Sequence, residues 1–229
     1  MRMITRFKNW RQTEAEKLAP MSFGKKVRYI LYYYRFWIVG LVILVCMGLY
    51  VGDAVYQSRR EIVLQGFFTN DDYGLFDAGA ILDGYTSGLT LDKSQRVVFD
   101  DVLYIDLEGG ATDYTSASNG KIIAYIVTSE LDFVVTSVPV FQHFAADVPM
   151  ADFRALLPAD LLEQIGPGAL IELAGADGKT GAWGLDMSGS RFVRDSGVEA
   201  AKDFYILFVP RSAPNQEQLV DFIRYSFAQ

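Results

Sequence analysis

The longest apolar stretch of the chain begins at Phe36 and ends at Gly52, and it contains no charged residue. Its 17 residues would span about 25 Å as an α-helix, and neighbouring tyrosines and Trp37 extend this length toward the roughly 30 Å of a bilayer core. We therefore predict a transmembrane helix from Phe36 to Tyr56. A cleaved signal peptide is the alternative, but the 35 residues of basic sequence before the stretch favour a retained anchor.

After this anchor, short apolar runs alternate with amphipathic stretches. We expect strands at residues 62–68, 96–107 (as one strand or a pair), 132–136, 170–174, 182–187 and 204–209. We expect helices within 71–87 after a loop, at 112–130, around 140–146, at 160–165 and at 215–227. Strands separated by helices of this length predict an α/β fold with mixed or parallel strand pairing. The 169 residues from 61 to 229 are enough for one compact domain with its own core, and too few for two ordinary ones.

The residues before the anchor also have helical character. Ser22 fits the N-cap position of a helix, and the pattern predicts one continuous helix from residue 23 to residue 56. Residues 1–18 place Ile4, Phe7 and Trp10 at helical spacing. This short pattern fits either a helix lying on the inner leaflet or a solvated tail.

Charge is distributed unevenly on the two sides of the anchor. Residues 1–35 carry nine Lys/Arg and two Glu, a net charge of +7, whereas residues 61–229 carry ten Lys/Arg and twenty-five Asp/Glu, a net charge of −15. Because basic flanks stay in the cytoplasm, we expect a cytoplasmic N-terminus and an extracytoplasmic C-terminal domain on the cell membrane. The acidic domain would repel nucleic acid, which excludes that class of partner. The only cysteine, Cys46, lies in the anchor, so the outer domain has no disulfide or thiol chemistry.

No set of metal ligands stands out in the outer domain. His143 is the only histidine and has no Cys partner, so we interpret it as a structural or surface residue rather than a metal ligand. The acidic pairs at 71–72 and 100–101 lack the spacing of a calcium-binding loop. We interpret them as solvated carboxylates and expect no metal and no cofactor.

Two short motifs raise the question of catalysis. Ser118-Asn119-Gly120-Lys121 matches S-x-x-K, and Lys179-Thr180-Gly181 matches K-T-G, two signatures of serine penicillin-recognising enzymes. No S-D-N element lies between them, and 169 residues are too few for that two-subdomain fold. We therefore expect no catalytic residue and a protein that is not an enzyme.

Two segments of the outer domain resemble the extracellular solute-binding proteins of bacterial uptake systems. They are SELDFVVTSVPVFQHFAADVPMADFRALL, from residue 129 on, and FYILFVPRSAPNQEQLVDFIRYSF at 204–227. The amino end KKVRYILYYYRFWIVG is similar to uncharacterised single-pass membrane proteins of Gram-positive bacteria, the Firmicutes, that carry a reduced domain of this kind. The resemblance implies a shortened periplasmic-binding-protein-like fold. This chain departs from the typical family members, which are longer and mostly anchored through a lipidated Cys.

Ligands of open α/β sheets gather beyond the carboxyl ends of the strands. This rule nominates the polar side chains that follow three expected strands as ligand-binding residues: Thr69, Asn70, Asp71, Thr136, Ser137, Asp186 and Ser188. The alternative is that these residues serve only the turns in which they lie, because Asn, Asp, Ser and Thr favour turns generally.

Two hypotheses for function follow. The first is a membrane-anchored ligand-binding or sensing module for an unknown small solute, held in the lipid bilayer by Phe36 to Tyr56. The second is an interaction protein of a membrane or cell-envelope complex that keeps the fold without a ligand. An open cleft lined by polar loop ends would favour the first hypothesis. A filled cleft with exposed aromatic side chains from Tyr73, Phe76, Tyr85 or Tyr114 would favour the second.

Overall fold

The computed structural model describes residues 19–107, 109, 112–175 and 178–228. The chain divides into two compact units, Met1–Arg59 and Arg60–Gln229, and each is described here by itself. The helix or tail expected at residues 1–18 lies outside the described residues.

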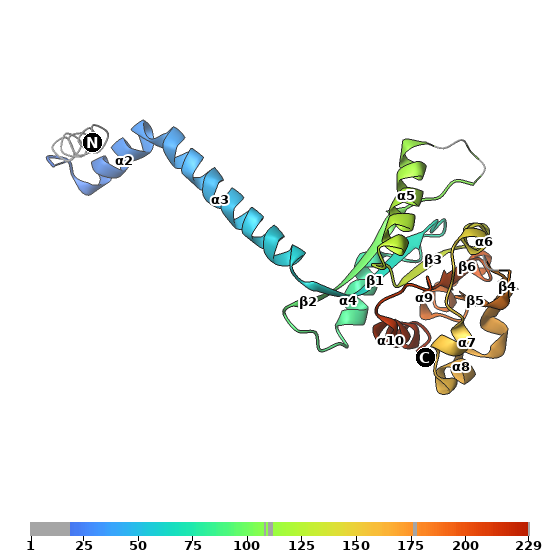
Figure 1. Ribbon diagram of the computed structural model, residues 1–229. Coiled ribbons are helices and arrows are strands. Elements are labelled where there is room, and N and C mark those ends of the chain that lie inside the picture. The colour runs from blue at the N-terminus through green and yellow to red at the C-terminus, as the bar shows by residue number, and fades with distance from the viewer. Residues whose placement is uncertain (1–18, 108, 110–111, 176–177, 229) are drawn as a thin grey trace. The chain divides into compact units, whose positions relative to one another are not determined.

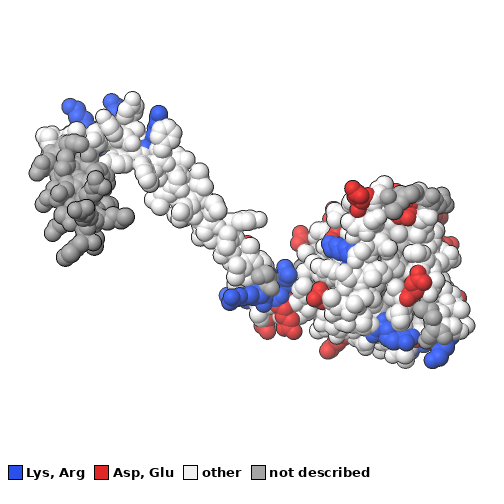
Figure 2. Space-filling view, turned by 45° about the horizontal axis from the view of Figure 1, so that its top comes forward, with Lys and Arg blue, Asp and Glu red and all other residues white. Residues whose placement is uncertain are grey.

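The first unit contains the helices α2 (Phe23–Tyr33) and α3 (Arg35–Ser58) (Figure 1). α3 is the helix, among the described residues, that is long and apolar enough to cross a membrane. Figure 2 shows Lys and Arg gathered over α2, with uncharged side chains along the apolar part of α3.

The expectation of a single helix from 23 to 56 was wrong, because the helix is interrupted at Tyr34, whose φ and ψ are −107° and 12°. Tyr34 and four further aromatic residues lie within the sequence YYYRFW, and bulky aromatic side chains lose rotamer freedom in a helix. An interruption therefore costs little here.

The second unit is a mixed α/β domain built on one six-stranded sheet with the order β2-β1-β3-β6-β5-β4. The strands are β1 (Glu61–Thr69), β2 (Gln95–Leu103), β3 (Phe133–Ser137), β4 (Leu170–Ala174), β5 (Thr180–Asp186) and β6 (Tyr205–Phe208). β1 pairs in parallel with both β2 and β3, whereas the pairs β3–β6, β6–β5 and β5–β4 are antiparallel. The mixed pairing expected from the sequence is confirmed.

Helices cover both faces of the sheet. One core contains side chains of α4 (Ala78–Thr86), α7 (Phe153–Leu156), α8 (Ala159–Ile165), α9 (Arg191–Arg194) and α10 (Gln216–Ser226). The core on the other face contains side chains of α5 (Asp113–Val127) and α6 (Val138–Asp147). Two short 3-10 helices, Pro167–Ala169 and Glu199–Ala201, complete the elements of the described residues.

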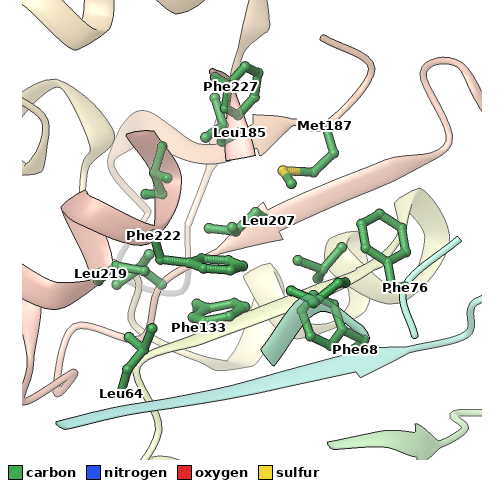
Figure 3. Close-up of a cluster of buried hydrophobic side chains, with 14 of the residues drawn as sticks. Leu64, Phe68, Phe76, Phe133, Leu185, Met187, Leu207, Leu219, Phe222 and Phe227 are labelled. Atoms are coloured by element: carbon green, nitrogen blue, oxygen red, sulfur yellow. The ribbon is translucent and has the colours of Figure 1, made fainter. Parts of the chain in front are cut away.

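Phe133 in β3 is at the centre of the first core (Figure 3). Its ring stacks on Phe222 of α10, with ring centroids 4.7 Å apart, and meets the edges of Phe68 and Phe99. Gly66 in β1 makes room for it, since a Cβ at Gly66 would lie 2.1 Å from the Phe133 ring. A side chain at position 66 would therefore displace the central aromatic ring of the core.

The buried carboxylate of Asp132 joins three segments that are distant in sequence. It accepts hydrogen bonds from the backbone N–H of Gln65 at 2.8 Å, from the backbone N–H of Asn215 at 2.8 Å and from the Asn215 side-chain amide at 3.1 Å. Burial raises the pKa of this carboxyl, and the hydrogen bonds from Gln65 and Asn215 oppose that shift. Asp132 therefore holds β1, the start of β3 and the N-terminus of α10 together.

Most elements agree with the sequence pattern to within one or two residues, but the strand expected at 96–107 ends four residues earlier than predicted. β2 ends at Leu103, and the segment after it is held by Asn70, whose side chain bonds both backbone groups of Ile105. Strand pairing is replaced there by side-chain hydrogen bonds, which a pattern of apolar residues does not reveal.

We predict that Asp132→Ala lowers the free energy of unfolding of the second unit by about 2–4 kcal/mol, because it leaves buried amide donors without their charged acceptor. Urea unfolding of the full chain in detergent, followed by tryptophan fluorescence, measures the change. The matched control is Asp147→Ala at an exposed position, which should change stability by less than about 0.5 kcal/mol. Equal effects of the two variants would contradict the role given to Asp132.

Candidate functional site

The seven side chains nominated from the sequence lie along one edge of the sheet. β1, β3 and β5 all run in the same direction, since β6 is antiparallel to both β3 and β5. Their carboxyl ends therefore meet at the same edge. There Ser137 pairs with Tyr205 of β6, and Asp186 pairs with Ile206 of β6. The strand-end rule placed these residues together correctly, and their contacts decide what each one does.

The crevice between β1 and β3 is the point where the strand order reverses, and it is filled. The Thr69 hydroxyl donates a hydrogen bond to the Thr136 hydroxyl at 2.7 Å, and both side chains are buried. Asn70 follows with a φ of +53°, a left-handed conformation that Asn tolerates better than most residues. Its amide donates to the Ile105 carbonyl at 2.7 Å and accepts from the Ile105 N–H at 2.9 Å. These polar groups satisfy one another and the backbone.

Asp71 lies just beyond the carboxyl end of β1, next to Asn70 in the chain. One carboxylate oxygen accepts a hydrogen bond from the Tyr205 hydroxyl at 2.7 Å, and the other accepts from the Phe76 backbone N–H at 2.7 Å. The Tyr205 oxygen also accepts from the backbone N–H of Tyr73 at 3.1 Å. Burial raises the pKa of the Tyr205 hydroxyl well above its ordinary value of 10.0, and the hydrogen bond to Asp71 raises it further. Asp71 thus orders the loop before α4.

Asp186 and Ser188 form a second group at the end of β5. The Ser188 backbone N–H and hydroxyl donate to one Asp186 oxygen at 2.9 and 2.5 Å. The Ser188 hydroxyl also accepts from the backbone N–H of Asp203 at 2.7 Å. Asp203 has a φ of +58°, in the left-handed region, so this hydrogen bond holds a strained residue two positions before the start of β6. The Ser188 hydroxyl thereby holds the carboxylates of Asp186 and Asp203 close to each other.

A pocket of about 540 Å³ opens beside these two carboxylates. It lies between α6 and the hairpin strand β4, with Ile206 of β6 also in its wall. Its lining residues are Val138, Phe141, Gln142, Gly168, Ile171, Glu172, Leu173, Asp186, Asp203 and Ile206. The walls are mainly apolar, and none of these lining residues is a Lys or an Arg. The volume is within the range of pockets for small molecules.

A glycine in β5 makes room for Phe141 and Ile206, two residues that line the pocket. A Cβ at Gly184 would lie 2.7 Å from both the Phe141 ring and the Ile206 side chain. Without one, α6 can approach the sheet at this point and form one wall of the pocket. A glycine within a strand is a known sign of a close approach, and the sequence AWGLDM carries it. Of the seven nominated residues only Asp186 lines the pocket. The other lining residues come from elements that no sequence pattern brings together, so the sequence analysis did not nominate them.

Two residues of the S-x-x-K motif, Ser118 and Lys121, make contacts within the domain. Ser118 is buried in α5, where its hydroxyl accepts a 3.4 Å hydrogen bond from the Tyr104 N–H. The Lys121 ammonium pairs with the Asp100 carboxylate at 2.5 Å and lies 5.3 Å from the centre of the Phe67 ring. Its charge is therefore held by Asp100 rather than directed at a nucleophile.

His143 is exposed on α6, as a surface histidine should be. The described residues contain no group of three or more His, Cys, Asp or Glu side chains placed to hold a metal ion. In the two acidic pairs, Asp100 and Asp101 are not simply solvated, because Asp101 accepts a hydrogen bond from the Ala78 N–H at 2.9 Å and Asp100 pairs with Lys121.

No family model, curated protein or solved structure matches this chain. The resemblance to solute-binding proteins therefore stays a prediction from sequence patterns.

The contact between Thr69 and Thr136 predicts a structural rather than a ligand-binding role. We expect Thr69→Val and Thr136→Val each to cost about 1–2 kcal/mol of unfolding free energy, because each leaves a buried hydroxyl without its partner. The double variant should cost less than the sum of the two by about 1 kcal/mol, since neither hydroxyl then remains. Urea unfolding of all four proteins closes the cycle, and strictly additive losses would contradict the contact.

The raised pKa of Tyr205 predicts a loss of stability at alkaline pH. The folded-state pKa exceeds the unfolded value of 10.0, so the stabilisation is complete below pH 10 and is lost as pH rises through the folded value. This group should contribute a decline of up to about 1.4 kcal/mol per pH unit above pH 10. Tyr205→Phe should be less stable than the wild type at pH 8, and the difference should narrow toward pH 11. Parallel unfolding curves at each pH test this, and a constant difference would show that the hydroxyl is not buried as described.

Proposed function

We propose that this chain is a single-pass membrane protein whose domain outside the cell membrane binds a small ligand and catalyses no reaction. The observation that carries this proposal is the open pocket between α6 and β4, beside the carboxylates of Asp186 and Asp203. Two expectations from the sequence belong to the same proposal: the anchor is α3, and the domain is a shortened relative of the extracellular solute-binding proteins.

The placement in the membrane is supported by length and charge. The stretch Arg35–Gln57 has 23 residues, which as a helix span about 35 Å and exceed the roughly 30 Å of a bilayer core. The net charge of +7 on residues 1–35 favours a cytoplasmic N-terminus. An acidic domain beyond the anchor is then extracytoplasmic.

The pocket lining favours a ligand with a protonated amine and an apolar body. Phe141, Ile171 and Ile206 contribute apolar surface, and Asp186 and Asp203 contribute negative charge. The third carboxylate, Glu172, is already paired with Arg154, so it attracts a cation less. A carboxylate binds an ammonium group more strongly than it binds a neutral hydrogen-bond donor, because the hydrogen bond is charge-assisted.

We predict that an amine ligand stabilises the domain. At about one hundred times its Kd, a ligand adds roughly 2.7 kcal/mol, which for this size corresponds to a rise in Tm on the order of 5–10 °C. The measurement is thermal unfolding of the full chain in detergent against a panel of alkyl and aromatic amines, amino acids, sugars and short peptides.

Three variants give this experiment its controls. The double variant Asp186→Asn/Asp203→Asn should weaken amine binding about 10-fold. This factor corresponds to the loss of one charge-assisted hydrogen bond worth roughly 1.5 kcal/mol. Gln142→Trp, which places an indole ring at the pocket wall, should abolish the response. Asp83→Asn/Glu217→Gln removes the same charge from exposed positions elsewhere and should leave binding unchanged. A Tm rise that survives Gln142→Trp would place the ligand somewhere else.

The second candidate function is an interaction protein without a ligand, and two observations favour it. The crevice between β1 and β3 is filled by Thr69 and Thr136. In addition, α5 exposes Ile123 and Val127, the latter at 77% of its surface. The aromatic patch expected for this function is present only in part, since Tyr73 and Tyr114 are exposed whereas Phe76 and Tyr85 are in the core. No response across the ligand panel would favour this candidate.

A further inference from the structure

The helix α2, which precedes the proposed anchor, has one apolar side. Phe23, Val27 and Leu31 follow one another at intervals of four residues, so they lie along the same side of the helix. Their side chains are 83%, 40% and 55% exposed. Three large apolar side chains on one side of a helix of about three turns are costly to leave in water.

The opposite side of α2 is basic. Lys25, Arg28 and Tyr32 follow at intervals of three and four residues, about half a turn away from the apolar side. Lys26 lies between the two sides, and residues 23–33 include no Asp or Glu. Figure 2 shows blue atoms spaced along this part of the chain. Apolar side chains opposed by Lys and Arg are typical of helices that lie in the membrane interface.

The break at Tyr34 allows α2 to take a different direction from α3. With a ψ of 12°, Tyr34 leaves the helical conformation, and α3 begins at the next residue. The uncharged run of α3 starts at Phe36, three residues after α2 ends. If α3 crosses the membrane, the C-terminal end of α2 is therefore at the membrane surface.

We propose that α2 lies in the plane of the inner leaflet, with Phe23, Val27 and Leu31 among the acyl chains and Lys25, Lys26 and Arg28 bound to anionic phospholipid headgroups. This inference rests on the proposed anchoring through α3. A lipid surface is the occupant that fits both sides of the helix at once, since it offers apolar chains and negative charge at the same boundary. The function of such a helix is to bind anionic lipids and to fix the chain at one depth.

The chain's single cysteine makes a direct test possible. The full-length protein is reconstituted in vesicles of phosphatidylcholine with one quarter phosphatidylglycerol, and a nitroxide label is attached to Cys46 or, in a Cys46→Ser background, to one new cysteine. The new cysteines are Val27→Cys and Leu31→Cys on the apolar side and Lys25→Cys and Arg28→Cys on the basic side. Oxygen and a water-soluble nickel complex report the depth of each label. We expect labels 27 and 31 to be oxygen-accessible, like Cys46, and labels 25 and 28 to be nickel-accessible.

The outcomes separate this inference from the anchor. Nickel access at all four α2 labels, with Cys46 shielded, would overturn the inference and leave the anchor standing. Nickel access at Cys46 would overturn the anchor itself. Shielding of labels 27 and 31 from both reagents would show that protein and not lipid covers the apolar side, which would also overturn the inference.

The requirement for anionic lipid is tested by charge. Lys25→Gln/Lys26→Gln/Arg28→Gln should shift the equilibrium of label 31 away from the bilayer by roughly 5-fold for each charge removed. Omitting phosphatidylglycerol should have the same effect on the wild type. The matched control, Lys93→Gln/Lys179→Gln/Lys202→Gln, removes three charges from the other unit and should change nothing. Equal depth of label 31 in neutral and anionic vesicles would overturn the assignment of the headgroups.

Discussion

The domain depends on the carboxylate of Asp132. Residues 62–69, 132–137 and 215–226 are far apart in sequence, and this one side chain bonds to backbone or side-chain groups of β1 and of the α10 N-terminus while it opens β3. A buried charge is costly without partners, so the carboxylate is tolerated only where these donors surround it. These hydrogen bonds therefore form in only one alignment of β1, β3 and α10. Phe133, the next residue, packs between Gly66 and Phe222, so its place in the core follows from the same registry.

The carboxyl edge of the sheet has two parts. In one part the polar side chains stabilise the fold, and in the other a pocket is open to a ligand. At β1 and β3, the polar side chains bond to one another and to the backbone, which stabilises the reversal of strand order and leaves little space there. At β5 and β6, the absence of a side chain at Gly184 lets α6 approach the sheet, and the pocket opens between α6 and β4. The same edge thus has a closed half and an open half. The difference arises from contacts of a few side chains and not from the order of the strands.

The two units have opposite physical characters. The first contains the helices α2 and α3, whose exposed side chains are mostly apolar or basic, and the second is an acidic domain with buried cores on both faces of its sheet. Apolar side chains exposed along a whole helix are stable only if something other than water surrounds them. The second unit buries its apolar side chains in its own cores, so it is stable in water. This contrast is the physical basis for assigning the lipid contacts to the first unit and ligand binding to the second.

The sequence alone determined the anchor candidate, the α/β class and most of the elements, because these follow from local periodicity and from runs of apolar residues. It also placed the polar strand ends at one edge, since strands alternating with helices bring their carboxyl ends together. Only the tertiary structure decided which of those polar residues are used internally. The role of Asn70 depends on Ile105, that of Asp71 depends on Tyr205, and the position of Phe141 at the pocket wall depends on the absence of a side chain at Gly184. These partners are 35 to 134 residues apart in the chain, and no local pattern specifies which distant side chain will satisfy a given polar group.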